Sequence, residues 1–562
     1  MNSDLQFAPG GSLRARLRLD AWTLGVCAAA LLLAAPVLVV YSFVLHPAGE
    51  VWRHLAATVL QEYVVNSLLL ALGVAGGTLL MGVSTAWLCT MCRFPGRRLF
   101  QWGLLLPMAM PAYIIAYTYT GMLDFSGPVQ TVLRAWFGWG YGDYWFPQVR
   151  SLGGAVVMLA LVLYPYVYLL ARAAFLEQST CVLEVSRTLG CGPWRSFFTV
   201  ALPLARPAIT AGLTLALMEA LADFGTVQYF GVSTFTTGIF RTWFGLGDSA
   251  AAAQLAALMM TLVLALIVLE RWSRRRARYH HTTLRYRTLP GYFLGGWRMV
   301  AAMAACLGPL FLGFLLPAMQ LGAWAWRTWR QTFDAHFWVL LRNSLLLAVS
   351  AAGMALILAL FMAYGQRLRR WPLIAGAVRV AGMGYAVPGL VIAVGVIIPF
   401  AWLDNTLDGW MRATFGISTG LLLSGTLTAL LFAYLVRFLA VSLHTVEAAM
   451  GKIRPSMDEA GRSLGLRPLA VLRSIHLPML RGSLLTALLL VFVDVLKELP
   501  ATLILRPFNF NTLAVRAFEL ASDELLAESS PAALAIVLAG LVPVILLSRS
   551  IRRARPGGEH AS

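Results

Sequence analysis

The chain has 562 residues, of which 59% are hydrophobic and 12% are charged. A soluble protein of this length needs more charge to cover its surface, so the composition excludes an ordinary soluble fold. The net charge of +19 would suggest nucleic acid in a soluble chain, but here it lies in short loops between apolar stretches. We therefore expect no nucleic-acid partner and interpret the basic loops as membrane-orienting signals.

Twelve apolar windows follow one another along the chain, and each approaches the roughly 20 apolar residues that a membrane-spanning helix needs. They lie at residues 21–45, 64–90, 101–122, 152–173, 204–224, 250–270, 296–318, 340–363, 378–403, 418–441, 480–500 and 533–550. These windows predict an all-α polytopic membrane protein with about 12 transmembrane helices. The first window lacks a clear cleavage site, so we expect it to be retained.

Basic residues gather in alternate loops. The arginine-rich loops are Arg14–Arg18, Arg93–Arg98, Arg271–Arg278, Arg367–Arg370 and Arg552–Arg555. The other loops are aromatic and poor in positive charge, as in GWGYGDYWFPQ, where Trp139, Tyr141 and Trp145 are expected to be interfacial anchors. By the positive-inside rule, the arginine-rich loops and both termini are cytoplasmic.

A mixed-polarity loop at residues 177–203 interrupts the first six windows. It contains EVSRTLGCGPWRSFFTVALP, which runs from Glu184 to Pro203. A glycine permits a tight reversal after a helix, and a proline favours the first turn of the next one. We expect short helices that form a stiff elbow against the inner membrane surface.

The span after this elbow carries two acidic residues. Glu219 and Asp223 are four residues apart in MEALADFGTVQYFG, which would place them on one helix face. Ionisable residues inside spans usually face a cavity or a partner. They indicate either a substrate path or a gating or structural pair, and helix capping by Asp223 stays open. The candidates for an outer gate or a docking surface are Thr226, Tyr229, Thr234, Thr236 and Thr237.

The basic stretch ERWSRRRARYHHTTLRYR separates two similar halves. We expect a first transmembrane half at residues 1–270, a cytoplasmic linker at 271–292 and a second half at 293–562. The matches are Asn66-Ser67-Leu68 with Asn343-Ser344-Leu345 and Pro111 with Pro388 at an offset of 277, and Phe235 and Thr237 with Phe510 and Thr512 at an offset of 275. Six spans in each half make the repeats parallel, related by a pseudo-twofold axis along the membrane normal.

The second half repeats the elbow at residues 452–478. EAGRSLGLRPLAVLRSIHLP runs from Glu459 to Pro478, and both copies fit E-x2-R-x-L-G-x2-P-x8-L-P. The shared positions are Glu184/Glu459, Arg187/Arg462, Leu189/Leu464, Gly190/Gly465, Pro193/Pro468, Leu202/Leu477 and Pro203/Pro478. A single copy could be a simple connector, but two stiff elbows at matched positions suit force transfer from a soluble partner.

The acidic pair recurs in the second half. Asp494 and Glu498 occupy the positions of Glu219 and Asp223, and Lys497 lies beside them. Four pseudo-symmetric carboxylates would make an acidic ring suited to a cation, because hard trivalent cations favour oxygen ligands. We predict no firm metal site, with Asp223 and Glu498 as transient contacts. Cys89 and Cys92 form a CxxC that is expected to serve packing, with a metal site as the alternative.

The two elbows resemble the EAA coupling motif of binding-protein-dependent ABC importer permeases. The glutamate, glycine and leucine-proline positions of that motif correspond to Glu184, Gly190, Leu202 and Pro203, and to Glu459, Gly465, Leu477 and Pro478. The first copy reads Glu-Val-Ser and the second Glu-Ala-Gly where the family prefers Glu-Ala-Ala. The resemblance implies a MetI-like, type I importer transmembrane domain in each half, in a bacterial inner membrane.

In that family the loop inserts into a cleft on an ATP-hydrolysing subunit. The resemblance therefore implies two copies of an ABC ATPase on the cytoplasmic face, a periplasmic substrate-binding protein and surrounding lipid as partners. No G-x4-G-K-[ST] phosphate loop occurs here, and Lys452 and Lys497 are the only lysines. We expect a translocation subunit that is not an enzyme and holds no cofactor, with ATP and magnesium on the partner.

The sequence segments around the carboxylates give a more specific indication of the substrate. DFGTVQYFGVSTFTTGIFRTWF and KELPATLILRPFNFNTLA are similar to the fused, two-half iron(III) permeases of the family. That similarity implies ferric ion as substrate, with thiamine, phosphonate or polyamine as alternatives in the same class. An ion-coupled secondary transporter would also have two six-helix repeats, and a membrane-embedded enzyme is disfavoured because no HExxH motif occurs.

Overall fold

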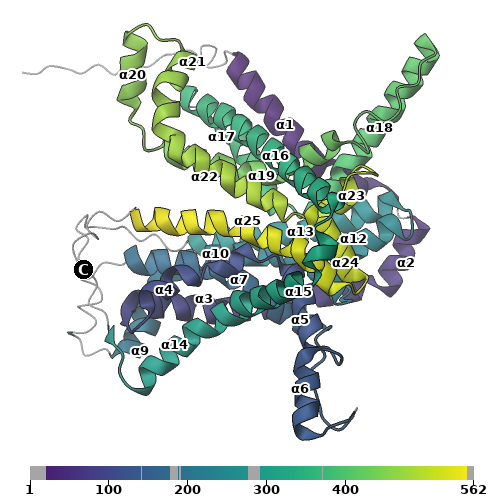
Figure 1. Ribbon diagram of the computed structural model, residues 1–562. Helices are drawn as coiled ribbons and strands as arrows, with labels where there is room; N and C mark the ends of the chain where they lie inside the picture. The colour runs from purple at the N-terminus through teal and green to yellow at the C-terminus, as the bar shows by residue number, and fades with distance from the viewer. Residues whose placement is uncertain are drawn as a thin grey trace, which may run out of the picture.

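Long helices that run in a common direction make up both halves of the chain (Figure 1). The computed structural model describes residues 20–47, 49–140, 142–177, 188, 192–275, 292–369 and 371–553. The first half contains α1 (Ala21–Ser42), η2 (Phe43–Leu45), α2 (Glu50–Thr58), α3 (Leu60–Met91), β1 (Cys92–Arg93), α4 (Arg97–Gly103), η3 (Leu106–Ala109), α5 (Ala112–Leu123), α6 (Pro128–Phe137), α7 (Leu152–Glu177), α9 (Pro193–Ser196), η4 (Phe197–Ala201), α10 (Leu202–Ala222), α11 (Gly225–Tyr229), α12 (Phe235–Phe244) and α13 (Ser249–Arg275).

The second half has a similar order of elements, although its strand comes before its first span and not after its second. It contains β2 (Tyr292–Phe293), α14 (Trp297–Leu310), η5 (Phe311–Leu315), α15 (Leu316–Thr332), α16 (Ala335–Leu368), α17 (Pro372–Ala381), η6 (Gly384–Ala386), α18 (Gly389–Phe415), α19 (Leu427–Met450), α20 (Pro455–Ser463), α21 (Pro468–Val471), η7 (Leu472–His476), α22 (Leu477–Leu496), α23 (Pro500–Leu505), α24 (Leu513–Ser522) and α25 (Leu526–Arg553). Since α13 continues to Arg275, the first residues of the predicted linker are helical.

Eleven helices in the described ranges are long and apolar enough to cross a membrane. A twelfth span arises only if Arg97–Ala109 and Ala112–Phe137, which meet at 92°, are counted as one. The predicted window at residues 101–122 therefore corresponds to this bent pair and not to one continuous helix. Pro107 in η3 and Pro111 before α5 interrupt the helix, because proline has no backbone N–H to donate.

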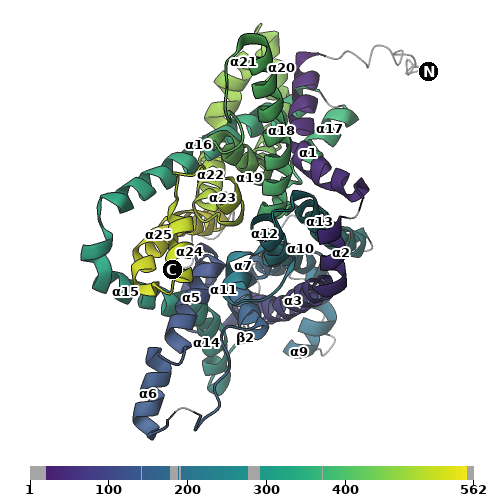
Figure 2. The ribbon, with the colours of Figure 1, turned by 90° about the vertical axis from the view of Figure 1, so that its right-hand side faces the viewer.

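The first span of each half packs on the opposite half. Helix α1 lies against α17 and α18, as Figure 2 shows, while α14 lies against α3 and α15 lies against α5. Helix α15 also packs on α25 of its own half. Two apolar cores result, and each draws side chains from both halves. The short parallel pairing of β1 with β2 adds a further link, since Cys92 pairs with Tyr292 at the start of the second half.

Matching hydrogen bonds confirm the internal repeat. The Asn66 side-chain amide donates to the Ser233 carbonyl oxygen at 2.9 Å, and the Asn343 amide donates to the Asn511 carbonyl oxygen at 3.3 Å. The alignment of Phe235 and Thr237 with Phe510 and Thr512 is wrong, however. Thr234 is the N-cap of α12 and Thr512 is the N-cap of α24, so these two threonines are equivalent and the loop before α24 is longer.

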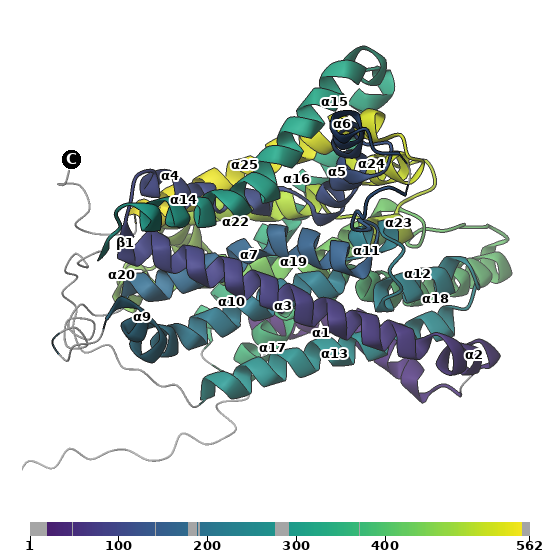
Figure 3. The same ribbon diagram turned by 90° about the horizontal axis from the view of Figure 1, so that it is seen from below.

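The elbows of both halves lie at one end of the bundle. Figures 1 and 3 both place α9 and α20 at the same end, on the side where the helix α25 finishes. Helix α2 and the far end of α18 lie at the opposite end (Figure 3). The arrangement gives the molecule one face that carries both elbows.

Candidate functional site

The second elbow is a helical reversal built from α20, α21 and η7. Gly465 follows α20 with φ of +80°, a left-handed conformation that favours glycine. The reversal is closed by backbone hydrogen bonds from Gly465 N–H to the Arg462 carbonyl and from Leu466 N–H to the Gly461 carbonyl. Pro468 then begins α21, and Leu477 and Pro478 begin α22. The predicted elbow of short helices is therefore present in the second half.

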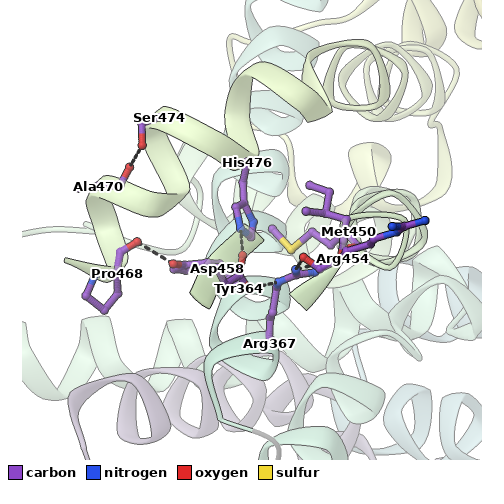
Figure 4. A network of polar contacts seen from close by, with 10 residues as sticks. Tyr364, Arg367, Met450, Arg454, Asp458, Pro468, Ala470, Ser474 and His476 are labelled. Atoms are coloured by element: carbon purple, nitrogen blue, oxygen red, sulfur yellow. Dashed lines mark hydrogen bonds and ion pairs between the residues drawn. The ribbon is translucent and has the colours of Figure 1, made fainter. Parts of the chain in front are cut away.

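A polar network fastens this elbow to the bundle, as Figure 4 shows. The Arg367 Nε donates to Asp458 Oδ2 at 2.7 Å, and the other Asp458 oxygen lies 2.6 Å from His476 Nε2. The Tyr364 hydroxyl donates to the Pro468 carbonyl oxygen at 2.6 Å. Burial disfavours the charged carboxylate, but the hydrogen bonds from Arg367 and His476 outweigh it and hold the pKa of Asp458 below its ordinary value.

The outer face of the second elbow is exposed. Glu459, Arg462, Gly465 and Pro468 are all exposed, and the Leu464 side chain is 82% exposed. An exposed leucine beside a glutamate and an arginine, at the tip of a fixed helical reversal, is a surface suited to a protein partner.

The first elbow is only partly described. Glu184, Arg187 and Gly190 lie outside the described residues. Pro193 begins α9, and Leu202 and Pro203 begin α10, as the repeat predicts. The Trp194 and Phe198 side chains on this segment are 76% and 59% exposed and stack on each other with centroids 6.4 Å apart. The described part thus also presents an exposed apolar surface.

The acidic residues lie at helix ends, which corrects the expectation that each pair shares one helix face. Helix α10 ends at Ala222, and Asp223 turns into an extended conformation. Its Oδ1 accepts hydrogen bonds from the Thr226 and Val227 N–H groups at 3.0 and 3.2 Å, so Asp223 caps α11.

Glu498 makes the same cap in the second half. It follows the end of α22, and its carboxylate accepts from the N–H groups of Ala501 and Thr502 at 2.9 and 3.1 Å. The Thr502 hydroxyl adds a bond of 2.6 Å. Asp223 and Glu498, the predicted transient metal contacts, therefore use their oxygens to hold the chain reversals at α11 and α23.

The four carboxylates nevertheless meet in one cavity between the halves. The cavity has a volume of about 120 Å³, and Glu219, Asp223, Asp494 and Glu498 all line it. Two basic residues share it. Lys497 Nζ lies 2.8 Å from Asp494 Oδ1, and Arg437 Nη1 lies 3.3 Å from Glu498 Oε1. The predicted acidic ring is thus a mixed cluster in which four carboxyl groups face two basic groups.

Arg437 is the functional candidate that the sequence reasoning missed. It lies on α19, is 8% exposed, and its Nη2 is 4.0 Å from Glu219 Oε2 in the other half. A single arginine inside the apolar window at 418–441 was the available signal, because intramembrane charges are costly and usually functional. Its counterpart in the first half is Val162, so the repeat pattern did not reveal it.

Most of the remaining candidates are buried in the described part of the chain. Thr226, Thr234, Thr236 and Thr237 are buried, which rules out the docking-surface prediction for them. The Thr234 and Thr237 side chains form the capping box of α12. Tyr229 lies under Arg150, with the guanidinium carbon 5.1 Å from the ring centroid. Tyr141 lies outside the described residues, whereas Trp139 and Trp145 are 37% and 85% exposed.

No group of three or more histidine, cysteine, aspartate or glutamate side chains in the described ranges could hold a metal ion. Cys89 and Cys92 are both buried and free. Burial raises the pKa of the Cys92 thiol to about 11, which disfavours the thiolate that a metal requires. Cys181 and Cys191 lie outside the described residues.

Comparison with known proteins identifies the family. The family described as binding-protein-dependent transport system inner membrane component matches residues 78–279 and 337–556, once in each half. These matches cover most of the chain, and the chain belongs to this family. Both matched segments contain one elbow and one pair of cavity carboxylates. The chain is therefore a multi-pass inner membrane protein of a binding-protein-dependent transport system.

Individual relatives are similar to this chain over both halves or over about one third of its length. The Fe(3+)-transport system permease protein FbpB 2 of Haemophilus influenzae is 25% identical over 494 residues, which cover 87% of this chain and 90% of the relative. The putative ferric transport system permease protein FbpB 1 of the same organism is 24% identical and covers 81% of this chain and 72% of the relative. The molybdenum transport system permease protein ModB of Escherichia coli is 29% identical but covers 35% of this chain and 86% of the relative.

Proposed function

We propose that this chain, as the inner membrane component of a binding-protein-dependent transport system, is the permease subunit of an ATP-driven importer for ferric iron. The observation that carries the proposal is the similarity to a Fe(3+)-transport permease along 87% of the chain, through both halves. A relative that matched one half alone would support the transport class but not the fused arrangement.

The two elbows are the contact points for the motor. They lie at one end of the bundle (Figure 3), and the described parts of both present exposed apolar side chains. We assign this end to the cytoplasm, together with both termini, because the arginine-rich loops belong to it. Two elbows receive two copies of an ABC ATPase, which hold the ATP and magnesium, so the chain itself is a translocation subunit and not an enzyme.

The opposite end receives a periplasmic substrate-binding protein. ATP binding would draw the two ATPases together, and the elbows would transmit that movement to the spans. Since both apolar cores contain side chains from both halves, a rotation of one half repacks both cores. The cavity between the halves would then open to alternate sides of the membrane.

The composition of the cavity favours a cation. Carboxyl groups outnumber basic groups four to two among its lining residues, and oxygen donors suit a hard trivalent ion. Asp223 and Glu498 are occupied as helix caps, so Glu219 and Asp494 are the carboxylates that a passing cation would contact. Lys497 and Arg437 would act as tethered counter-ions that the cation displaces.

An oxyanion is the second candidate, favoured by the same two basic residues and by the similarity to a molybdenum permease. Thiamine, phosphonate and polyamine stay open as substrates of the same class. An ion-coupled secondary transporter would use the carboxylates for proton or sodium coupling, but it gives the paired elbows no role.

The test is transport into proteoliposomes that contain the complex of this chain with its cognate ATPase and binding protein. Radioactive ferric ion, molybdate, thiamine, phosphonate and polyamine are supplied on the binding-protein side. We expect ferric uptake that requires ATP and continues when a protonophore collapses the membrane potential. Uptake of another solute alone would contradict the iron assignment, and uptake without ATP that stops with the protonophore would contradict the importer class.

A further inference from the structure

Helix α6 leaves the bundle sideways. It belongs to the segment Ala112–Phe137, which lies at 92° to the preceding segment Arg97–Ala109. Figures 1 and 2 both show α6 projecting away from the bundle, and in Figure 1 it crosses the direction in which α3 and α10 run. The axis of α6 therefore runs along the membrane surface and not through the membrane.

The level at which α6 leaves the bundle can be compared with α3. Helix α3 has 32 residues and is about 48 Å long, whereas the hydrocarbon core of a membrane is about 30 Å thick. Figures 1 and 3 both place α6 closer to the elbows than α2, which directly precedes α3. Since α3 is longer than the core, a helix that leaves the bundle short of its outer end lies near the boundary of the hydrocarbon.

The residues of α6 divide into two faces. The apolar face repeats at intervals of three and four residues and consists of Val129, Val132, Leu133 and Trp136. The polar face contains Gln130 and Arg134, which are four residues apart and therefore lie above one another. A helix that is divided in this way buries its apolar face against something less polar than water.

The chain itself covers the polar face. The Gln130 amide donates to the Leu123 carbonyl oxygen at 2.7 Å, and the Tyr144 hydroxyl donates to Gln130 Oε1 at 2.6 Å. Arg134 Nη1 donates to the Phe125 carbonyl oxygen at 2.8 Å, and the guanidinium carbon lies 4.0 Å from the centroid of the Phe125 ring. The segments on either side of α6 thus pack on its polar side, which leaves the apolar side facing outwards.

The outward side is rich in aromatic rings. The Trp136 side chain is 79% exposed, and Val132 and Phe137 are exposed as well. The Phe137 ring stacks on Trp139 with centroids 4.5 Å apart, and Trp139 stacks on Tyr144 with centroids 5.2 Å apart. Aliphatic and aromatic side chains therefore form one continuous exposed surface along the helix and past its end.

The chemistry of this surface favours lipid over a soluble protein. Tryptophan and tyrosine gather where a membrane meets water, because their rings suit the headgroup level. A surface that binds a soluble protein has an apolar centre with a polar rim, whereas Gln130 and Arg134 of α6 are bonded to the chain's own backbone. An amphipathic helix with aromatic residues on its apolar face, lying along the membrane surface, is typical of interfacial insertion.

We propose that α6 is an interfacial helix whose apolar face is inserted into the leaflet at the end opposite to the elbows, with Trp136 and Phe137 in contact with phospholipid. The partner is a lipid surface. Since α6 continues the segment that begins with Ala112 and Tyr113, which line the cavity between the halves, the lipid contact anchors one wall of that cavity. The proposal goes beyond the proposed function and depends on neither the substrate nor the ATPase.

The experiment measures tryptophan fluorescence of the full chain in lipid nanodiscs. The chain has 18 tryptophans, so the emission of one residue is taken as the difference between the wild type and a Trp→Phe variant. Trp136→Phe isolates the residue on α6. Trp410→Phe is the matched control, because Trp410 is also exposed but belongs to the outer part of α18, which extends further from the elbows than α6 (Figures 1 and 3).

Two quenchers are compared, bromine on the lipid acyl chains and acrylamide in the water. We expect the Trp136 emission to lose about half of its intensity or more when the bromines lie near the ester end of the chains, because interfacial helices insert about 5–10 Å deep. Bromines at the methyl end should quench it less. The Trp410 emission should respond to acrylamide and not to bromine. Both substitutions keep an aromatic ring at an exposed position, so the melting temperature should stay unchanged.

A Trp136 that acrylamide quenches as strongly as it quenches Trp410, with no response to bromine, would overturn the proposal, because α6 would then lie in water. Acrylamide quenching of Trp136 that disappears when the cognate binding protein is added would also overturn it and would make α6 a docking surface for that protein. Equal bromine quenching of Trp136 and Trp410 would contradict the specific insertion of α6. No substrate enters the measurement, so a wrong substrate assignment would leave its outcome unchanged.

Discussion

The Nη2 of Arg437, on α19 of the second half, lies 4.0 Å from the Oε2 of Glu219, on α10 of the first half. The same guanidinium also contacts Glu498 at 3.3 Å, so one arginine bridges carboxylates of both halves beside the cavity. This contact joins the two repeats at the place where alternating access would have to part them.

Arg437→Gln should destabilise the protein strongly. Removing one partner of a buried ion pair costs roughly 3–5 kcal/mol, because the remaining charge stays buried. We expect a lowered melting temperature in detergent, followed by tryptophan fluorescence, and partial recovery when Glu498→Gln is added. The control is Arg412→Gln, which breaks an exposed pair with Asp408 and should cost under about 1 kcal/mol. Equal melting temperatures for the two single variants would show that Arg437 is not buried as an ion pair.

Asp223→Asn should leave uptake nearly unchanged. Asparagine caps helices about as well as aspartate does, whereas Asp223→Ala should cost roughly 1 kcal/mol through the lost α11 cap. Glu219→Gln and Asp494→Asn should instead reduce ferric uptake, and Asp494→Asn should also lower the stability because it leaves the Lys497 ammonium without its charged partner. The measurements are thermal unfolding and initial uptake rates. Loss of uptake in a stable Asp223→Asn protein would show that the Asp223 carboxylate belongs to the substrate path.

Gly465→Val should weaken the coupling of ATP hydrolysis to uptake more than Gly465→Asn does. Residue 465 has φ of +80°, which asparagine tolerates and a β-branched residue does not; the left-handed conformation costs roughly 1–2 kcal/mol for non-glycine residues. No atom lies within 4 Å of an added Cβ, so backbone strain is the relevant cost. Gly482→Ala, in the helix α22 with open space around it, is the control. The readout is uptake per ATP, and identical values for Val and Asn would contradict the role of the reversal.

The second elbow should hold its structure across neutral pH and loosen only in acid. The pKa of Asp458 is lowered in the folded protein, so its contribution is present above its unfolded pKa of about 4 and is lost as the pH falls through the lower folded value. Hydrogen exchange of residues 455–466, corrected for the intrinsic pH dependence, should stay constant from pH 8 to about 5. Asp458→Asn should show raised exchange throughout, and a wild-type transition near pH 6 would point to another titrating group.

Local patterns determined the class of this protein and the place of its elbows. Apolar windows, alternate arginine-rich loops and the repeat from Glu184 to Pro203 and from Glu459 to Pro478 depend on composition and spacing, which a linear chain displays directly. Gly465 was correctly assigned to the reversal for the same reason.

Tertiary structure decided what the carboxylates do and how the elbows are held. Helix periodicity predicted a shared face for Glu219 and Asp223, but α10 ends at Ala222, and the position of a helix end depends on what packs beyond it. Arg437 enters the cavity from a distant helix, and Arg367 meets Asp458 across 91 positions of sequence. A one-dimensional repeat records which residues are equivalent, whereas ion pairs between helices depend on how the helices are packed in space.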